Sequence, residues 1–329
     1  MKKRVSLQMI AACLLLSCTF IAASTQKAHA GGAVVIKKQA MTNEQALVLG
    51  VVEGVTEYLP VSSTGHLLLA ERIMGIGDDQ SQSKDQQERT KEAADAYTIC
   101  IQAGAILAVL WIYFGRIKQI WRGLIGKDRA GRRLLINVAA GFLPAAVLGL
   151  LFNKLIKSYL FGAWPVVIAW LIGGLAILAV SRRNQAQRQA ALPARQLDDM
   201  TAWMALGIGC AQCIAMWPGV SRSLVTIVGG LMVGLSLASA VEYSFLLGVV
   251  TLGAATAFDA LKHGQLMLQT FDHYSLIIGV VVAFVAAVLS VKWMVSYLSR
   301  HGLEILGYYR VIIAVLATVF LLTSKMIWI

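Results

Sequence analysis

The chain has 329 residues, of which 58% are hydrophobic and only 14% are charged, and its formal net charge is +12. This apolar fraction exceeds what a water-soluble domain of this size buries, so the composition excludes an ordinary soluble enzyme and predicts a polytopic helical protein whose solvent is a lipid bilayer. The basic excess is concentrated in two stretches, Arg116–Arg133 and Arg182–Arg195. Such clusters mark cytoplasmic loops, and no soluble domain remains for a nucleic-acid site, so no nucleic-acid partner is expected.

The first thirty residues are typical of an export signal. Basic Lys2-Lys3-Arg4 precedes an apolar stretch, and Ala28-His29-Ala30 has the small-x-small pattern of a cleavage site. We expect residues 1–30 to be a signal peptide. A retained helix is the alternative, and the sequence does not settle whether the segment is cut.

Six later segments are apolar and approach the roughly 20 residues that a helix needs to cross a bilayer. They are residues 97–114, 134–153, 162–181, 241–261, 275–298 and 305–325. Two other apolar regions are short and broken by proline: residues 44–59 and 62–76 around Pro60, and residues 201–217 and 221–235 around Pro218-Gly219. Each of these pairs predicts a re-entrant helical hairpin, which enters and leaves on one side of the membrane.

The two breaks share a Pro-x-x-Ser pattern, in Pro60–Ser63 and in Pro218–Ser221, and two spans follow each hairpin. Interrupted segments at corresponding places in two halves predict internal repeats with a site between them. With both basic stretches in the cytoplasm, residue 43 lies outside and the hairpins enter from opposite sides. The expected fold is all-α: six transmembrane helices plus two re-entrant hairpins in an inverted repeat, with halves at about 43–160 and 200–298. The polar stretches Gly77–Asp95 and Arg182–Asp199 are expected to be an external and a cytoplasmic loop.

Acids, hydroxyls and an imidazole gather around the first break. Glu53 and Glu57 are four residues apart, on one face of an apolar helix. They form either a structural pair satisfied by other side chains, or a pair that binds a divalent cation or shares a proton. After Pro60 come Ser62, Ser63, Thr64 and His66. A serine there can simply cap the helix, and a lone histidine is more often packed. However, helix-terminal amides and hydroxyls also bind phosphate, and Ser63 with His66 could serve as nucleophile and proton carrier.

At the second break, Ser221-Arg222-Ser223 places a guanidinium between two hydroxyls. An arginine inside an apolar region needs an anionic partner. Arg222 therefore pairs either with Glu53 or Glu57, or with a phosphate that its planar fork binds in bidentate fashion. Together the two breaks supply the side chains needed to bind and cleave a phosphoanhydride.

These two segments resemble the undecaprenyl-diphosphate phosphatase family associated with bacitracin resistance. The matching stretches are Gly50–His66 (GVVEGVTEYLPVSSTGH) and Trp217–Ser223 (WPGVSRS), and the resemblance extends over about residues 43–327, without the N-terminal extension. It implies a single membrane phosphatase domain over residues 31–329, in the inner membrane of a bacterium, with its site facing the outer side. The implied reaction is hydrolysis of undecaprenyl diphosphate to undecaprenyl phosphate, which returns the lipid carrier for peptidoglycan synthesis.

The same resemblance implies the site residues and the cofactor. The essential group is Glu53, Glu57, Ser63, His66 and Arg222, with Ser62, Thr64, Ser221 and Ser223 around the phosphates. A divalent cation, Mg²⁺ or Ca²⁺, is expected at Glu53 and Glu57. Attack by Ser63 and attack by an activated water both stay open, as does the number of subunits, a homodimer included. A lipid-phosphate flippase is the alternative function, because many transporters have inverted repeats with broken helices.

Overall fold

The computed structural model describes residues 41–76, 84–160, 162–189, 193–270 and 273–323. The expected signal peptide, residues 1–30, lies outside these residues. The described part contains eleven α-helices and two 3-10 helices, so the all-α expectation is confirmed there. The first half comprises α2 (Asn43–Thr56), α3 (Ser63–Ile73), α4 (Lys84–Ile112), α5 (Phe114–Leu124), α6 (Arg129–Leu160) and α7 (Ala163–Gln189). The remainder comprises η1 (Leu197–Asp199), α8 (Ala202–Gln212), η2 (Cys213–Met216), α9 (Arg222–Met232), α10 (Leu237–Thr270), α11 (His273–His301) and α12 (Glu304–Thr323).

Each of the six expected spans overlaps a helix that is long and apolar enough to cross a membrane, although the expected span 97–114 continues past the end of α4 at Ile112. The apolar windows are Ala94–Ile112, Arg129–Phe152, Ala163–Arg183, Leu237–Lys262, His273–His301 and Glu304–Thr323. Among the described helices, Ala202–Met216 and Arg222–Met232 are apolar but shorter. Six candidate spans and interrupted short helices are therefore confirmed by length and composition.

The expected loops are wrong in extent, because helices continue through their polar residues. α4 begins at Lys84, inside the stretch Gly77–Asp95, and α7 continues to Gln189. The stretch Arg116–Arg133 contains most of α5 and the first turn of α6. Lys, Arg, Gln, Glu and Ala dominate these stretches and have high helix propensity, so a helix that leaves the apolar layer need not end there.

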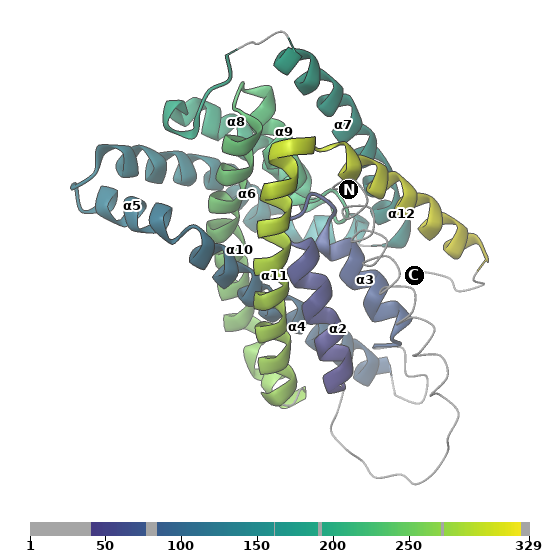
Figure 1. Cartoon of the computed structure of the whole chain (residues 1–329). Helices are drawn as coiled ribbons and strands as arrows, with labels where there is room; N and C mark the ends of the chain where they lie inside the picture. Colours follow the sequence, from purple (N-terminus) through teal and green to yellow (C-terminus); the bar gives the residue numbers. More distant parts are fainter. Residues whose placement is uncertain (1–40, 77–83, 161, 190–192, 271–272, 324–329) are drawn as a thin grey trace.

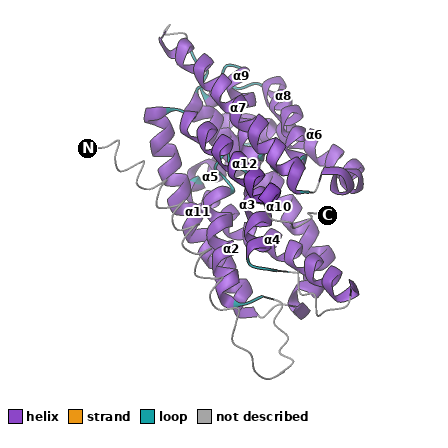
Figure 2. Ribbon diagram, turned by 90° about the vertical axis from the view of Figure 1, so that its right-hand side faces the viewer, coloured by secondary structure: helices purple, strands orange, loops and turns teal. Residues whose placement is uncertain are grey.

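The short helices lie at opposite ends of the molecule. In Figure 1, α2 and α3 occupy the lower part of the view, α8 and α9 the upper part, and α10 and α11 run along most of its height. α2 packs on α11, and α8 packs on α6. Figure 2 shows the same helices from the side, joined by short loops.

Both of these packings depend on glycine. A Cβ at Gly50 of α2 would collide with the backbone of Gly279 in α11, and a Cβ at Gly209 of α8 would collide with the backbone of Gly141 in α6. Small residues allow helix backbones to approach closely where the solvent is lipid. The two close approaches fix the ends of α2 and α8 that lead into the breaks.

Candidate active site

The two broken helices begin with the same unusual backbone conformation. Ser62 caps α3 with φ 74° and ψ 99°, and Ser221 caps α9 with φ 78° and ψ 116°. They are the only non-glycine residues of the described chain with positive φ. Their side chains accept from the amides of Gly65 and Leu224. Such strain costs roughly 1–3 kcal/mol per residue and clusters at functional sites.

These caps correct the register of the expected repeat by one residue. The shared Pro-x-x-Ser pattern aligns Ser63 with Ser221, whereas the helix caps align Ser62 with Ser221. Ser63 and Arg222 are then equivalent, each the first helical residue after its cap. The cap lies two residues after Pro60 in the first break and three residues after Pro218 in the second, where Gly219 has a positive φ of 93°.

Arg310 of α12 holds the two breaks together. Its guanidinium is fully buried and donates to the carbonyl of Pro60 at 3.2 Å and to that of Gly219 at 2.7 Å. It also donates to the carbonyls of Ala169 and Trp170 in α7. Four carbonyl acceptors compensate its burial, since a buried cation needs hydrogen bonds on all sides.

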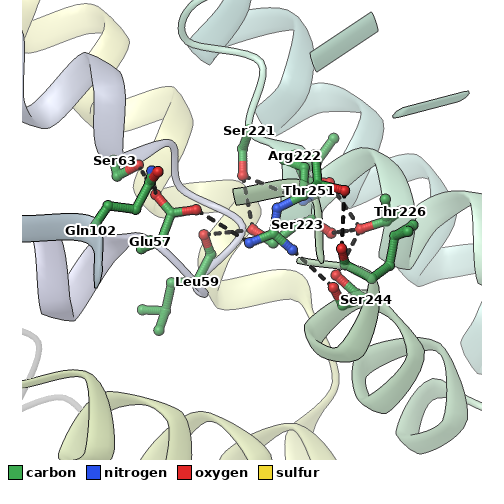
Figure 3. Close-up of polar contacts among 12 residues, drawn as sticks. Glu57, Leu59, Ser63, Gln102, Ser221, Arg222, Ser223, Thr226, Ser244 and Thr251 are labelled. Atoms are coloured by element: carbon green, nitrogen blue, oxygen red, sulfur yellow. Dashed lines mark hydrogen bonds and ion pairs between the residues drawn. The ribbon is translucent and has the colours of Figure 1, made fainter. Parts of the chain in front are cut away.

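Glu57 lies at the centre of the polar contacts between the breaks. Its Oε2 accepts a hydrogen bond from the Ser63 hydroxyl at 2.5 Å and one from the Gln102 amide at 3.4 Å. Its Oε1 forms an ion pair with Arg222, at 3.2 Å. Figure 3 shows Glu57 between Ser63 and Gln102 on one side and Arg222 on the other. The carboxylate is only 7% exposed, so these donors compensate its burial.

Arg222 reaches Glu57 from the second half of the chain. Its other terminal nitrogen donates to the Ser244 carbonyl at 2.8 Å, and the guanidinium lies over the Tyr58 ring at 5.2 Å. A Cβ at Gly248 would collide with the guanidinium in this position, so a larger residue there would displace it. Nε of Arg222 has no hydrogen-bond partner among the described residues. One donor therefore remains for a ligand.

A cavity of about 250 Å³ opens between the two breaks. Its polar lining residues include Glu57, Ser62, Ser63, Thr64, Gln102, Gln212, Ser221, Arg222 and Thr251. Its small or apolar lining residues include Ala145, Gly149, Ala215, Met216 and Leu252. The polar lining suits an anionic headgroup, and the apolar lining suits a hydrocarbon.

Comparison of the sequence with known proteins identifies the family. Residues 46–316 match the model of the bacitracin resistance protein BacA. The chain belongs to the BacA family.

Relatives named undecaprenyl-diphosphatase align over most of this BacA-family chain. One from Sorangium cellulosum is 43% identical over 272 residues, covering 82% of this chain and 84% of the relative. One from Nitrosomonas europaea is 43% identical over 267 residues, covering 81% and 90%. One from Rhodopseudomonas palustris is 42% identical over 285 residues, covering 85% and 98%. The family expected from the two motifs is therefore confirmed.

Most residues expected at the site of this BacA-family protein lie around the cavity. The two caps, Ser63, Thr64, Glu57 and Arg222 line it. Ser223 lies just behind, where its hydroxyl donates to the Leu59 carbonyl at 2.9 Å and is 3.0 Å from the hydroxyl of Ser221. These bonds connect α9 to the first break.

Glu53 and His66 are placed differently. Glu53 is 1% exposed, and its carboxylate oxygens make no hydrogen bond of good geometry among the residues described, although the side chains of Glu57 and Gln102 lie close to it. His66 is not among the residues that line the cavity: its Nδ1 is 2.6 Å from the Ser62 carbonyl and its Nε2 is 2.7 Å from the Tyr309 hydroxyl. The proton acceptor in contact with the Ser63 hydroxyl is thus Glu57 and not His66.

Four side chains at or near the site were not expected from the sequence: Gln102, Gln212, Thr251 and Arg310. Gln102 and Gln212 are amides within apolar segments, which was an available signal, because buried polar groups in membranes are costly and are often functional. Nothing in the sequence near Arg310 or Thr251 indicates their partners, which are distant in the chain.

Proposed function

We propose that the cavity between the two helix breaks is where this undecaprenyl-diphosphatase binds and hydrolyses its substrate. The observation that carries the proposal is Glu57, whose carboxylate accepts from the Ser63 hydroxyl and pairs with Arg222. A hydroxyl with a buried carboxylate as proton acceptor is an activated nucleophile, and the neighbouring cation is suited to an anionic substrate.

The diphosphate group is proposed to lie between the N-termini of α3 and α9. Both helices begin at the cavity, at Ser62 and at Ser221. Helix N-termini carry partial positive charge and present free amide donors, which favours phosphate binding. The unbonded Nε of Arg222 supports the same placement.

In the proposed reaction, Ser63 transfers its proton to Glu57 while its Oγ attacks the terminal phosphorus. The bond from that phosphorus to the bridging oxygen breaks, and undecaprenyl phosphate leaves with the electron pair. Water then hydrolyses the phosphoserine, which releases inorganic phosphate, and Glu57 returns the proton to Ser63. Direct attack by a water that Glu57 activates is the alternative that the same residues allow. In both versions Glu57 takes the role that the sequence suggested for His66.

A divalent cation fits Glu53 and Glu57. The two unbonded oxygens of the buried Glu53 carboxylate support this, since an ionised carboxylate without donors is costly unless it binds a cation or a proton. No cluster of three His, Cys, Asp or Glu side chains occurs in the described ranges, so substrate oxygens and water would complete the ligand set. When bound, Mg²⁺ or Ca²⁺ supplies charge that offsets the negative charge developing on the phosphates.

The two halves are proposed to form an inverted repeat with two re-entrant hairpins. The close-packed glycines and the helix caps have the same spacing in both halves, which supports the repeat. Gly50 lies twelve residues before the cap Ser62, and Gly209 lies twelve residues before the cap Ser221. The first short helix of each half also packs on a long helix of the other half. α2 of the first half packs on α11 of the second, and α8 of the second half packs on α6 of the first.

The cavity is proposed to face the outer side of a bacterial inner membrane. The connections around α5 and after α7 carry the basic residues, which favours the cytoplasm for both. Counting helices from them puts the start of α2 and the α10–α11 connection on the outer side. The short helices of the first half, which carry Glu57 and Ser63, then enter from outside.

The polyprenyl chain is proposed to leave along the apolar lining residues of the cavity, beside Ala145 and Gly149 of α6 and Leu252 of α10. At about 250 Å³ the cavity is smaller than the ~300–1,000 Å³ that enclose a drug-sized ligand, so it holds the headgroup and only the start of the chain. The rest of the chain belongs in the bilayer.

Phosphate release from undecaprenyl diphosphate by the purified, detergent-solubilised protein tests the function. We expect release by the wild type, at least about 100-fold slower release by Arg222→Ala and Glu57→Ala, and inhibition by a chelator. Folded wild-type protein that releases no phosphate with Mg²⁺ or Ca²⁺ present would contradict the proposal and favour the flippase. Unchanged release by both variants would place the reaction elsewhere.

A further inference from the structure

Gln212, the last residue of α8, is a buried amide that the mechanism above does not use. It is 2% exposed and lines the cavity that contains Ser63 and Arg222. Its Nε2 has no hydrogen-bond partner in the part of the chain that the structure describes. Buried donors in native proteins are almost always satisfied, so a donor without a partner at the wall of a ligand cavity indicates a bond to the ligand.

Thr251 of α10 lies beside this amide. Its hydroxyl is 3.4 Å from Oε1 of Gln212, and in this arrangement the amide nitrogen is the end without a partner among the described residues. Gln102 is arranged in the same way: its Oε1 accepts from the Thr256 hydroxyl at 3.3 Å, and its Nε2 donates to Glu57. The partner of the Gln102 amide is thus an anion, which shows that this cavity already contains one amide nitrogen that donates to an anionic group.

The position of Gln212 in the chain also sets it apart. It lies nine residues before the cap Ser221, as Glu53 lies nine residues before the cap Ser62. The first half therefore places a carboxylate where the second half places an amide donor. A phosphate presents acceptor oxygens, so it is matched by the half that carries Gln212 and Arg222.

We propose that Gln212 is a substrate-binding residue whose Nε2 donates a hydrogen bond to an oxygen of the diphosphate, with Thr251 as its positioning residue. The inference rests on the proposed site and adds a donor to it. Together with Arg222, Gln212 makes the second half the anion-binding half of the cavity.

The test compares Gln212→Leu and Gln212→Glu with Gln185→Leu, which makes the same exchange at an exposed glutamine of α7. Replacing Gln212 by leucine leaves the Thr251 hydroxyl with a partner, because this hydroxyl also donates to the Leu247 carbonyl at 3.0 Å. For each variant we would measure kcat/KM for undecaprenyl diphosphate, the inhibition constant of inorganic pyrophosphate, and the unfolding temperature.

We expect Gln212→Leu to lower kcat/KM by roughly 10- to 100-fold and to weaken pyrophosphate inhibition by a similar factor, at an unfolding temperature within a few degrees of the wild type. Gln212→Glu should lose more, because a carboxylate repels the phosphate. Gln185→Leu should match the wild type. Since pyrophosphate has no lipid chain, its weaker binding separates a lost headgroup contact from a general packing defect.

Wild-type kcat/KM and pyrophosphate affinity in folded Gln212→Leu would overturn the inference while leaving the phosphatase intact. Equal losses in the Leu and Glu variants with unchanged pyrophosphate inhibition would also overturn it, because the role would then be one of packing. A wild type that releases no phosphate would overturn the function and this inference together.

Discussion

Glu57 accepts hydrogen bonds from three side chains: Ser63, Gln102 and Arg222. Ser63 lies just across the first break, whereas Gln102 and Arg222 are distant in the sequence. These donors compensate the burial of the carboxylate, and removing a charged partner leaves a buried charge unpaired, at a cost of about 3–5 kcal/mol. The site is thus organised around one carboxylate. Residues that contact it are the ones whose loss should matter most.

Arg222→Lys tests whether the planar guanidinium is required. Arginine bonds Glu57 and the Ser244 carbonyl at the same time and keeps Nε free, which a lysine ammonium cannot do in this geometry. We expect kcat/KM to fall roughly 100-fold or more, because hydrogen bonds that the charged guanidinium makes are lost, including the one that we propose between its Nε and the substrate. The control is Arg300→Lys, at the exposed end of α11, and equal kcat/KM in both variants would contradict this account.

At the scale of the elements, α12 holds both breaks through Arg310. The guanidinium bonds to carbonyls at Pro60 and Gly219, so one side chain fixes two helix starts relative to each other. An unsatisfied buried carbonyl costs about 1–3 kcal/mol, and lysine cannot satisfy all four that Arg310 satisfies.

Arg310→Lys should therefore lower both the unfolding temperature in detergent and the kcat/KM for undecaprenyl diphosphate, and Arg310→Met should lower both further. The expected loss of stability for the Lys variant is about 1–3 kcal/mol. Circular dichroism on heating, combined with phosphate release, measures both effects. Wild-type values for the Met variant would show that the breaks hold without α12.

α6 contributes small or apolar residues to the cavity lining, where Gly149 leaves room beside Met216. If the polyprenyl chain passes here, Gly149→Leu should obstruct it. We expect kcat/KM for undecaprenyl diphosphate to fall about 10-fold or more, with a smaller change for hydrolysis of a short-chain diphosphate such as farnesyl diphosphate. Equal losses on both substrates would contradict this chain path.

On the scale of the whole molecule, the fold combines two pairs of short, broken helices with six helices long enough to span. Placing the basic connections in the cytoplasm predicts that Tyr274, at the start of α11, faces outward and that Lys127, between α5 and α6, faces inward.

Single cysteines at these two positions, in a background in which Cys13, Cys18, Cys100, Cys210 and Cys213 are replaced, test this arrangement. A membrane-impermeant maleimide applied to intact spheroplasts should label Tyr274→Cys, and it should label Lys127→Cys only after the membrane is permeabilised. The reverse pattern would invert the orientation and place the mouth of the cavity in the cytoplasm.

The spans and the breaks could be predicted from the sequence, because apolar windows and prolines act locally. The pairing of Arg222 with Glu57 was one of the alternatives that the buried charges left open. The roles of Arg310 and Gln212 could not be predicted, because their partners are a carbonyl 250 residues away in one case and a hydroxyl on another helix in the other. Helix ends were misplaced because polar helix formers continue a helix beyond the apolar layer.

The most direct test of the central claim, that Glu57 and Ser63 act as one unit, is a double-mutant cycle on single-turnover phosphate release from undecaprenyl diphosphate. Ser63→Ala and Glu57→Gln should each slow the chemical step by roughly 100- to 10,000-fold, and the double variant should be no slower than the slower single variant. Ser299→Ala, at the exposed end of α11, is the control and should match the wild type. If the two losses multiply, or if Ser63→Ala keeps the wild-type rate, Glu57 does not act through Ser63 and the account is contradicted.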